Sequence, residues 1–95
     1  MSYTEELRQA IEAGKEYPAL ARVRGQTGRV DVGFRLLKDG LIAGVRIVHA
    51  TGFSLLDEAA LRSVTRLGRF RPVPNEISGG GLNVVLPVEF RLLAR

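Results

Sequence analysis

Apolar and polar residues alternate from residue 29 to residue 36, and this two-residue period predicts a β-strand with one face in water. The apolar positions are Val30, Val32, Phe34 and Leu36. Asp39-Gly40, a dipeptide typical of tight hairpin turns, follows. The segment 41–49 is less regular, although Val45 and Ile47 keep the alternation. Residues 29–49 therefore predict a β-hairpin.

Apolar residues recur at helical spacing in residues 1–16. The segment opens with SYTE, a capping-box pattern in which Ser2 caps the helix and Glu5 bonds back to the cap. A narrow apolar stripe follows at Leu7, Ala10 and Ile11. Gly14 is placed to end this helix of about three turns. Because so narrow a stripe buries little surface, we expect the helix to be loosely attached.

A second helix is predicted for residues 54–67. Ser54 and Asp57 fit another capping box, Gly68 is placed to stop the helix, and two prolines soon afterwards prevent its continuation. Its apolar face consists of Leu56, Ala60, Val64 and Leu67. Between the first helix and the hairpin, the sequence ALARVRGQTG is predicted to be a basic connection that ends in glycine.

The last strand, residues 82–92, alternates again but contains a proline. Pro87 has no N–H for a sheet ladder, so we predict an edge strand whose proline faces the unpaired side. Residue parity fixes both the face of a side chain and the edge toward which its backbone groups point. The even residues should therefore fill the core and pair with a neighbouring strand. The odd residues of the predicted free edge are Asn83, Val85, Pro87, Glu89 and Arg91.

Three strands with one apolar face need a cover, which the two helices supply. The predicted fold class is α+β, a two-layer domain of topology α-β-β-α-β with a three-stranded antiparallel sheet. The strand order is 2-1-3, because the last strand leaves a helix that crosses back over the sheet to the first strand. We expect a single domain over residues 1–95, with the loosely attached helix in residues 1–16 and the core in residues 17–93.

Composition fits one small folded domain. Of the 95 residues, 45% are hydrophobic and 25% charged, which is typical of a globular chain with a thin core. The net charge of +4 is a modest surplus that favours a solvated basic surface over nucleic-acid binding. Absence of cysteine excludes disulfides and thiolate metal sites. Neither a membrane span nor a signal peptide is apparent, so a membrane-tethered protein would contain this chain as one piece.

Catalytic chemistry finds no support. His49 is the single histidine and has no nucleophile or base at a recognisable spacing, while the carboxylates lack metal-ligand spacing. We therefore expect no enzymatic activity and no cofactor. A basic cluster stands at the end of the second predicted helix, at Arg62, Arg66, Arg69 and Arg71. It either complements the helix dipole or meets an acidic partner or anionic lipid.

Several motifs together resemble the C-terminal domain of TonB over residues 15–93. They are Tyr17-Pro18, Gly28-Arg29-Val30, Asp39-Gly40, Ser54-x-x-Asp57 with Ala59-Ala60, RLGRFRPVP and LPVEFRL. The resemblance implies a periplasmic domain of a protein anchored in the inner membrane of a Gram-negative bacterium. Such domains bind the TonB box, a short segment of outer-membrane transporters, by adding it as a strand beside their last strand.

The resemblance also implies partners. ExbB and ExbD, acting through an N-terminal part of the protein, couple such domains to the proton-motive force for uptake of siderophores, haem or cobalamin. Further contacts with the transporter are expected at Tyr17, Pro18, Arg22, Arg69 and Arg71. Arg22 is the nearest arginine to the position at which some relatives touch the transporter.

Other interpretations stay open at this point. Prolines and charges also protect sheet edges from aggregation, and Pro87 can serve that purpose while leaving room for a chosen partner. A TolA-like periplasmic interaction domain would share the fold. A small basic nucleic-acid-binding domain is the alternative of a different class. The predicted edge also suggests an edge-paired or strand-swapped homodimer.

Overall fold

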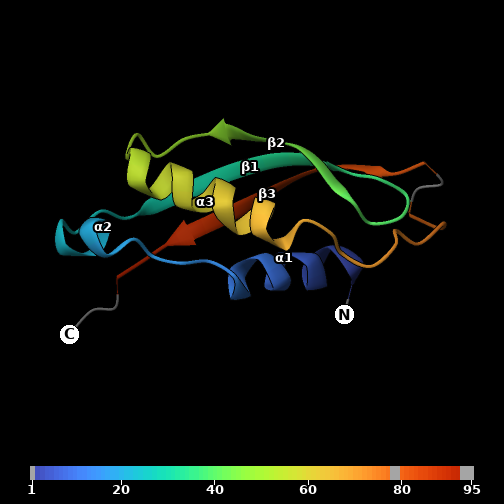
Figure 1. The fold of residues 1–95 in the computed structure, drawn as a ribbon, viewed down its shortest axis with the longest axis horizontal. Helices are drawn as coiled ribbons and strands as arrows, with labels where there is room; N and C mark the ends of the chain where they lie inside the picture. Colours follow the sequence, from blue (N-terminus) through green and yellow to red (C-terminus); the bar gives the residue numbers. More distant parts are fainter. Residues whose placement is uncertain (1, 78–79, 93–95) are drawn as a thin grey trace.

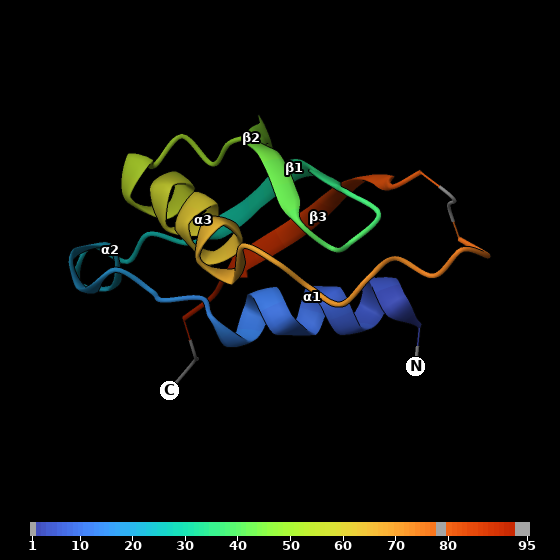
Figure 2. The same cartoon turned by 45° about the vertical axis from the view of Figure 1, so that its right-hand side comes forward.

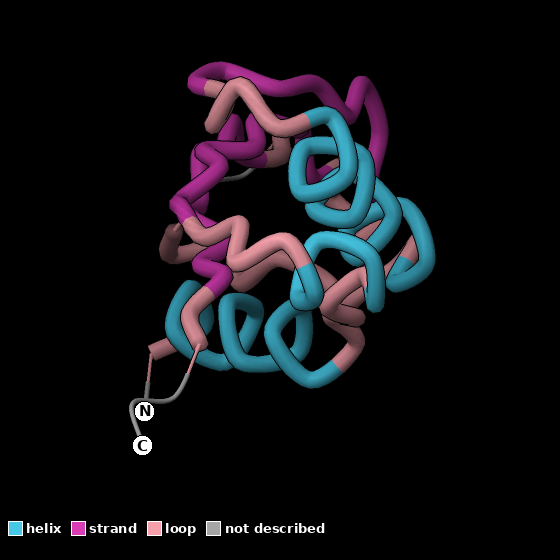
Figure 3. The backbone as a smooth tube through the Cα atoms, turned by 90° about the vertical axis from the view of Figure 1, so that its left-hand side faces the viewer, coloured by secondary structure: helices cyan, strands magenta, loops and turns pink. Residues whose placement is uncertain are grey.

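The computed structural model describes residues 2–77 and 80–92. Its elements, in chain order, are α1 (Tyr3–Ala13), α2 (Ala19–Val23), β1 (Gly28–Leu36), β2 (Ile42–His49), α3 (Ser54–Leu67) and β3 (Leu82–Phe90). The strands form one antiparallel sheet in the order β2-β1-β3. Figure 1 shows α3 crossing in front of the sheet and α1 running below it, and in Figure 3 the strands lie at the upper left with helices to their right and below them. The predicted α+β class and strand order are confirmed.

The β1–β2 hairpin closes at Gly40, as the sequence predicts. Gly40 has a φ of 93°, and an added Cβ there would lie 2.0 Å from the carbonyl oxygen of Phe70. The Phe70 N–H donates in turn to the Gly40 carbonyl at 2.9 Å. Only glycine meets both demands, because it tolerates a positive φ and allows close backbone approach. The turn is thereby fixed against the chain that follows α3.

β3 pairs with β1 along its whole length, from Leu82 opposite Leu36 to Phe90 opposite Gly28. The alternation is confirmed, because the side chains of Val84, Leu86, Val88 and Phe90 are buried. β3 ends two residues earlier than predicted, since β1 begins at Gly28 and offers no further partner. Pro87 stands opposite Asp31 without a break in the ladder.

α3 begins at Ser54, but its predicted capping box is wrong. The N-cap is Phe53, and the Asp57 carboxylate accepts from the backbone N–H and the hydroxyl of Thr51 at 2.9 and 2.8 Å. The Thr51 hydroxyl also accepts from the N–H of Phe53 at 2.9 Å. Asp57 is therefore used to fold the β2–α3 loop. Leu56, Ala60 and Val64 of the predicted apolar face are buried and Leu67 is partly buried, and the helix is capped by Gly68 with a φ of 67°.

α1 runs alongside β3 on the side away from β2 (Figures 1 and 2). Ser2 caps it as predicted, accepting from the N–H of Glu5 at 3.1 Å. The Glu5 carboxylate does not bond back to the cap, because both of its oxygens accept hydrogen bonds from the charged Arg8 guanidinium. The stripe that enters the core is Tyr3, Leu7 and Ile11. How firmly the helix is attached stays a prediction.

A short third helix, α2, occupies part of the segment predicted to be a basic connection. That prediction is wrong because ALARV consists mostly of good helix formers, and Ala21 is fully buried. Gly25, with a φ of 69°, turns the chain out of the helix toward β1. The described residues therefore form three helices where the sequence pattern indicates two.

Candidate functional site at the free sheet edge

One long side of β3 has no strand beside it. β3 is the outermost strand of the sheet and pairs with β1 alone among the described strands. In the first part of its outer edge, the backbone groups of Asn83 and Val85 bond to no described residue outside the sheet. Their side chains lie on the outer face of the sheet, where Asn83 is exposed and Val85 keeps 53% of its surface in solvent. The Asn83 side chain accepts from Arg35 at 2.9 Å on the outer face of the sheet.

The backbone of Glu89 shows which way the odd residues of β3 point. Its carbonyl accepts a hydrogen bond from the Nζ of Lys15, which lies beyond the end of α1. The carbonyl is thus directed away from β1. Because direction alternates along a strand, the backbone groups of Val85 and Pro87 share this outward direction. This geometry supports the edge predicted from parity and explains how the ladder accommodates Pro87.

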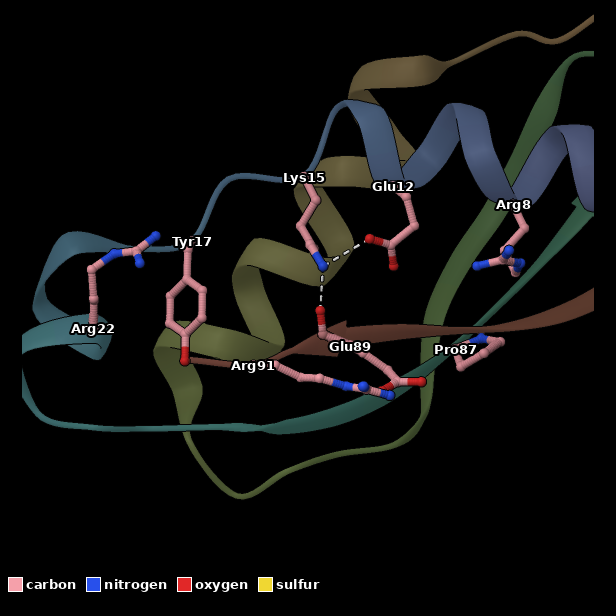
Figure 4. A pocket seen from close by; sticks show the side chains of 8 residues that line it. All are labelled: Arg8, Glu12, Lys15, Tyr17, Arg22, Pro87, Glu89 and Arg91. Atoms are coloured by element: carbon pink, nitrogen blue, oxygen red, sulfur yellow. Dashed lines mark hydrogen bonds and ion pairs between the residues drawn. The ribbon is translucent and has the colours of Figure 1, made fainter. Parts of the chain in front are cut away.

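A groove with a volume of about 510 Å³ lies between α1 and this edge. Its walls come from the polar side of α1, from the segment that leads through α2, and from the second half of β3 (Figure 4). The lining residues are Arg8, Glu12, Lys15, Tyr17, Arg22, Pro87, Glu89 and Arg91. Pro87 and Glu89 are half-buried because α1 stands beside them, whereas the sequence indicated that both would face water.

Positive charge predominates in the groove. Four of the lining residues are cations and two are carboxylates. Lys15 pairs with Glu12 at 2.7 Å, and the Arg91 Nε donates to Glu89 at 2.8 Å. Arg8 pairs with Glu5 outside the lining, and this hydrogen bond lowers the pKa of the Glu5 carboxyl. A surplus of positive charge favours an acidic ligand.

Tyr17 and Arg22 form one end of the groove. The Tyr17 ring stands edge-on to Phe90, with centroids 5.4 Å apart, and its hydroxyl donates to the carbonyl of Gln26. The Arg22 guanidinium lies 4.7 Å from the centre of the Tyr17 ring. Among the described residues no carboxylate pairs with Arg22. Its charge is therefore available to a ligand.

The structure brings together most of the residues predicted for the site. Five of them line the groove: Tyr17, Arg22, Pro87, Glu89 and Arg91. Asn83 and Val85 lie farther along the same edge, and Pro18 is the N-cap of α2, outside the lining.

Arg69 and Arg71 do not join the groove. Arg69 pairs with Asp39 at 3.2 Å, and Arg71 binds both carboxylate oxygens of Glu6 at 2.6 and 3.0 Å. A partner-binding role for these two residues stays a prediction.

Sequence reasoning missed the wall of the groove that α1 supplies. Arg8, Glu12 and Lys15 are four and three residues apart, which places them on one side of a helix. This spacing is visible in the sequence, but the element that faces it is not.

Other kinds of site find no support in the residues that the structure describes. Over residues 2–77 and 80–92, no three histidine or acidic side chains gather closely enough to hold a metal ion. No helix in the same ranges has the length and apolar character needed to cross a membrane.

Comparison with known proteins agrees with this geometry. The family model for the Gram-negative bacterial TonB protein C-terminal matches residues 13–92. Protein TonB of Pasteurella multocida is 36% identical over 91 residues, which are 96% of this chain and 34% of that protein. Protein TonB of Haemophilus influenzae is 33% identical over 63 residues, 66% of this chain and 23% of that protein. The chain thus spans only 23% to 34% of the length of these relatives.

Solved structures show the same fold. A solution structure of the Helicobacter pylori TonB C-terminal domain has a TM-score of 0.83 at 24% identity, covering 98% of this chain and 83% of that one. The corresponding Pseudomonas aeruginosa domain has a TM-score of 0.63 at 27% identity, with coverages of 85% and 81%. Fold and edge define a small α+β domain whose sheet stays open on one side. The chain belongs to the family of TonB C-terminal domains of Gram-negative bacteria.

Proposed function

We propose that this domain is the periplasmic binding module of a TonB-like energy transducer, and that it binds the TonB box of outer-membrane transporters by strand addition. The observation that carries the proposal is the outer edge of β3, which pairs with no described strand, makes no bond outside the sheet at Asn83 and Val85, and is continued by a charged groove. An extended peptide laid along this edge would extend the sheet by one strand.

Recognition of a peptide by strand addition suits a domain that binds several different transporters. Main-chain hydrogen bonds place little demand on the sequence of the peptide, so one edge can serve several transporters. Each such bond contributes about 0.5 to 1.5 kcal/mol net, so a short added strand should dissociate readily. The surplus positive charge of the groove, with Arg22 unpaired by any described carboxylate, favours boxes flanked by acidic residues.

The wider assignment rests on family membership. In this proposal the domain belongs to a protein anchored in the inner membrane, ExbB and ExbD couple that protein to the proton-motive force, and the transporters carry siderophores, haem or cobalamin. The domain contributes binding and the transmission of work, not catalysis.

A titration followed by nuclear magnetic resonance tests the docking edge. A synthetic peptide that carries a TonB box, added to the isotope-labelled domain, should shift the amide signals of residues 83–91. A peptide of the same composition in scrambled order is the control. Shifts confined to residues 62–71 would place the partner on the basic cluster and contradict strand addition. Absence of any shift at millimolar peptide would also contradict it.

A further inference from the structure

The side chain of Lys15 occupies the second half of the β3 edge. Its Nζ donates to the carbonyl of Glu89, pairs with the Glu12 carboxylate at 2.7 Å and lies 5.3 Å from the centre of the Phe90 ring. Figure 4 shows the side chain reaching from the end of α1 into the groove, with both polar contacts marked. Only 21% of the side chain is exposed, so the position is well defined.

The Lys15 ammonium occupies the place beside the Glu89 carbonyl that an added strand would need. Neighbouring strands lie about 4.8 Å apart, and their N–H groups stand about 2.9 Å from the carbonyls that they meet. The Glu89 carbonyl points away from β1, so the ammonium of Lys15 stands where an N–H of the incoming strand would stand. The stem of the lysine fills the adjoining space. Lys15 and a strand paired to Glu89 therefore exclude one another.

In the first half of the edge, no described residue outside the sheet bonds to the backbone groups of Asn83 and Val85. Val85 is half exposed, and Asn83 makes its side-chain bond on the outer face of the sheet. The edge is thus divided at Pro87 into two parts. The outward backbone groups of residues 83–85 bond to no described residue outside the sheet, whereas in residues 89–91 the Glu89 carbonyl is occupied by Lys15.

We propose that Lys15 is a latch on the docking edge. The incoming strand pairs first with residues 83–85, and it displaces the Lys15 ammonium from the Glu89 carbonyl in order to pair with residues 89–91. The inference rests on the proposed function and adds its regulation. Release of the Glu89 carbonyl requires only a rotation of the Lys15 side chain. The opposite end of α1 stays bound through Tyr3, whose hydroxyl donates to the carbonyl of Arg71 at 2.8 Å.

Replacement of the lysine tests the latch. Lys15→Met keeps an apolar stem over Phe90 but removes the donor, so the Kd for the TonB-box peptide should fall roughly three- to tenfold, the range of one ordinary hydrogen bond. Lys15→Arg restores a donor and should keep the wild-type Kd. Lys38→Met is the matched control for net charge, because Lys38 is the other lysine of the chain and is exposed in the β1–β2 turn. It should leave the Kd unchanged.

A spectroscopic measurement reports the displacement directly. In the free domain the nearby Phe90 ring should shift the side-chain methylene signals of Lys15, and these signals should move toward those of a solvated lysine as peptide is added. If the peptide shifts residues 83–91 while the Lys15 signals stay in place and Lys15→Met binds no more tightly, strand addition stands and the latch is wrong. If no variant binds the peptide, both proposals fail.

Discussion

A single residue, Pro87, fixes how the edge of β3 is used. It has no N–H, and its position opposite Asp31 leaves the ladder to β1 intact. Val85 and Glu89 are the neighbouring residues whose backbone groups also point away from β1. Each can donate its N–H to a docked strand, while Pro87 offers only its carbonyl. The pattern makes a prediction about two adjacent valines.

Val85→Pro should abolish strand addition with little effect on the fold. Its N–H points to the free edge, so the substitution removes a donor that only a partner uses, and the ring blocks a close approach. We expect binding of the TonB-box peptide to weaken more than about tenfold and the free energy of unfolding to change by about 0.5 kcal/mol or less. Calorimetric titration and chemical denaturation measure the two quantities.

Val84→Pro is the matched control for this prediction. Val84 is buried opposite Phe34, and its N–H points to β1. Losing that donor leaves a buried carbonyl unpaired, which should destabilise the domain by about 1 to 3 kcal/mol. If Val85→Pro is the more damaging of the two substitutions to stability, the assignment of edges is reversed.

At the scale of elements, α1 has an ion pair near each of its ends, and we expect these pairs to contribute to its attachment. Glu6 pairs with Arg71 near the first turn, and Glu16, just past the helix, pairs with Arg66. Hydrogen bonds from these arginines hold the pKa of each carboxyl below its ordinary value of 4.5. The apolar stripe of α1 contains only three buried residues. The attachment of α1 should therefore respond to acid.

The direction of that response follows from the lowered pKa values. A carboxyl whose pKa is lower in the folded state stabilises it fully above the unfolded pKa, and the contribution disappears as the pH falls through the folded pKa. Hydrogen exchange of the α1 amides should thus be slowest near neutral pH, relative to the intrinsic rate, and lose protection below about pH 4.5.

Glu6→Gln with Glu16→Gln is the reference for this measurement. The doubly substituted domain lacks both ion pairs, so its α1 should be less protected than the wild type at neutral pH. At acid pH the two should converge. A difference between them that is the same at pH 7 and pH 3 would show that the ion pairs do not hold the helix.

The elements differ in how far the sequence reveals them. β1 and β3 are predictable because each buries one face, so apolar residues occupy every second position of the strand. α2 is missed because five residues are too few for a periodic signal. The predicted capping box of α3 is wrong because the Asp57 carboxylate accepts hydrogen bonds from Thr51 in the preceding loop and not from the start of the helix.

The groove is only partly predictable for a related reason. Its β3 wall follows from strand parity, which is a local property. Its α1 wall depends on where the helix packs, which tertiary contacts decide. The helical spacing of Arg8, Glu12 and Lys15 indicates a charged side but not its neighbour.

At the scale of the whole molecule, the free edge can pair with a second copy of itself. Two β3 strands related by a twofold axis would align antiparallel and join the two sheets. The exposed Val85 lies at the open part of such a contact. We expect weak self-association, visible by light scattering as a molecular mass that rises with concentration.

Val85→Pro distinguishes this arrangement from other dimers. The substitution should keep the domain monomeric at every concentration if two β3 edges form the contact. The TonB-box peptide should likewise dissociate the dimer, because it competes for the same edge. A wild-type domain that stays monomeric at high concentration, or a dimer unaffected by the substitution, would contradict edge pairing.

The ladder between β3 and β1 has a mechanical consequence for a domain that transmits force. β3 is joined to β1 by nine residue pairs and anchored by buried side chains. A docked peptide would share with β3 only two short runs of bonds, separated at Pro87. Under tension along the strand, the contact with the peptide should rupture long before β3 leaves its own sheet. In the proposed function, the contact with the partner would therefore break first, and the domain would be released in its folded state and could bind again.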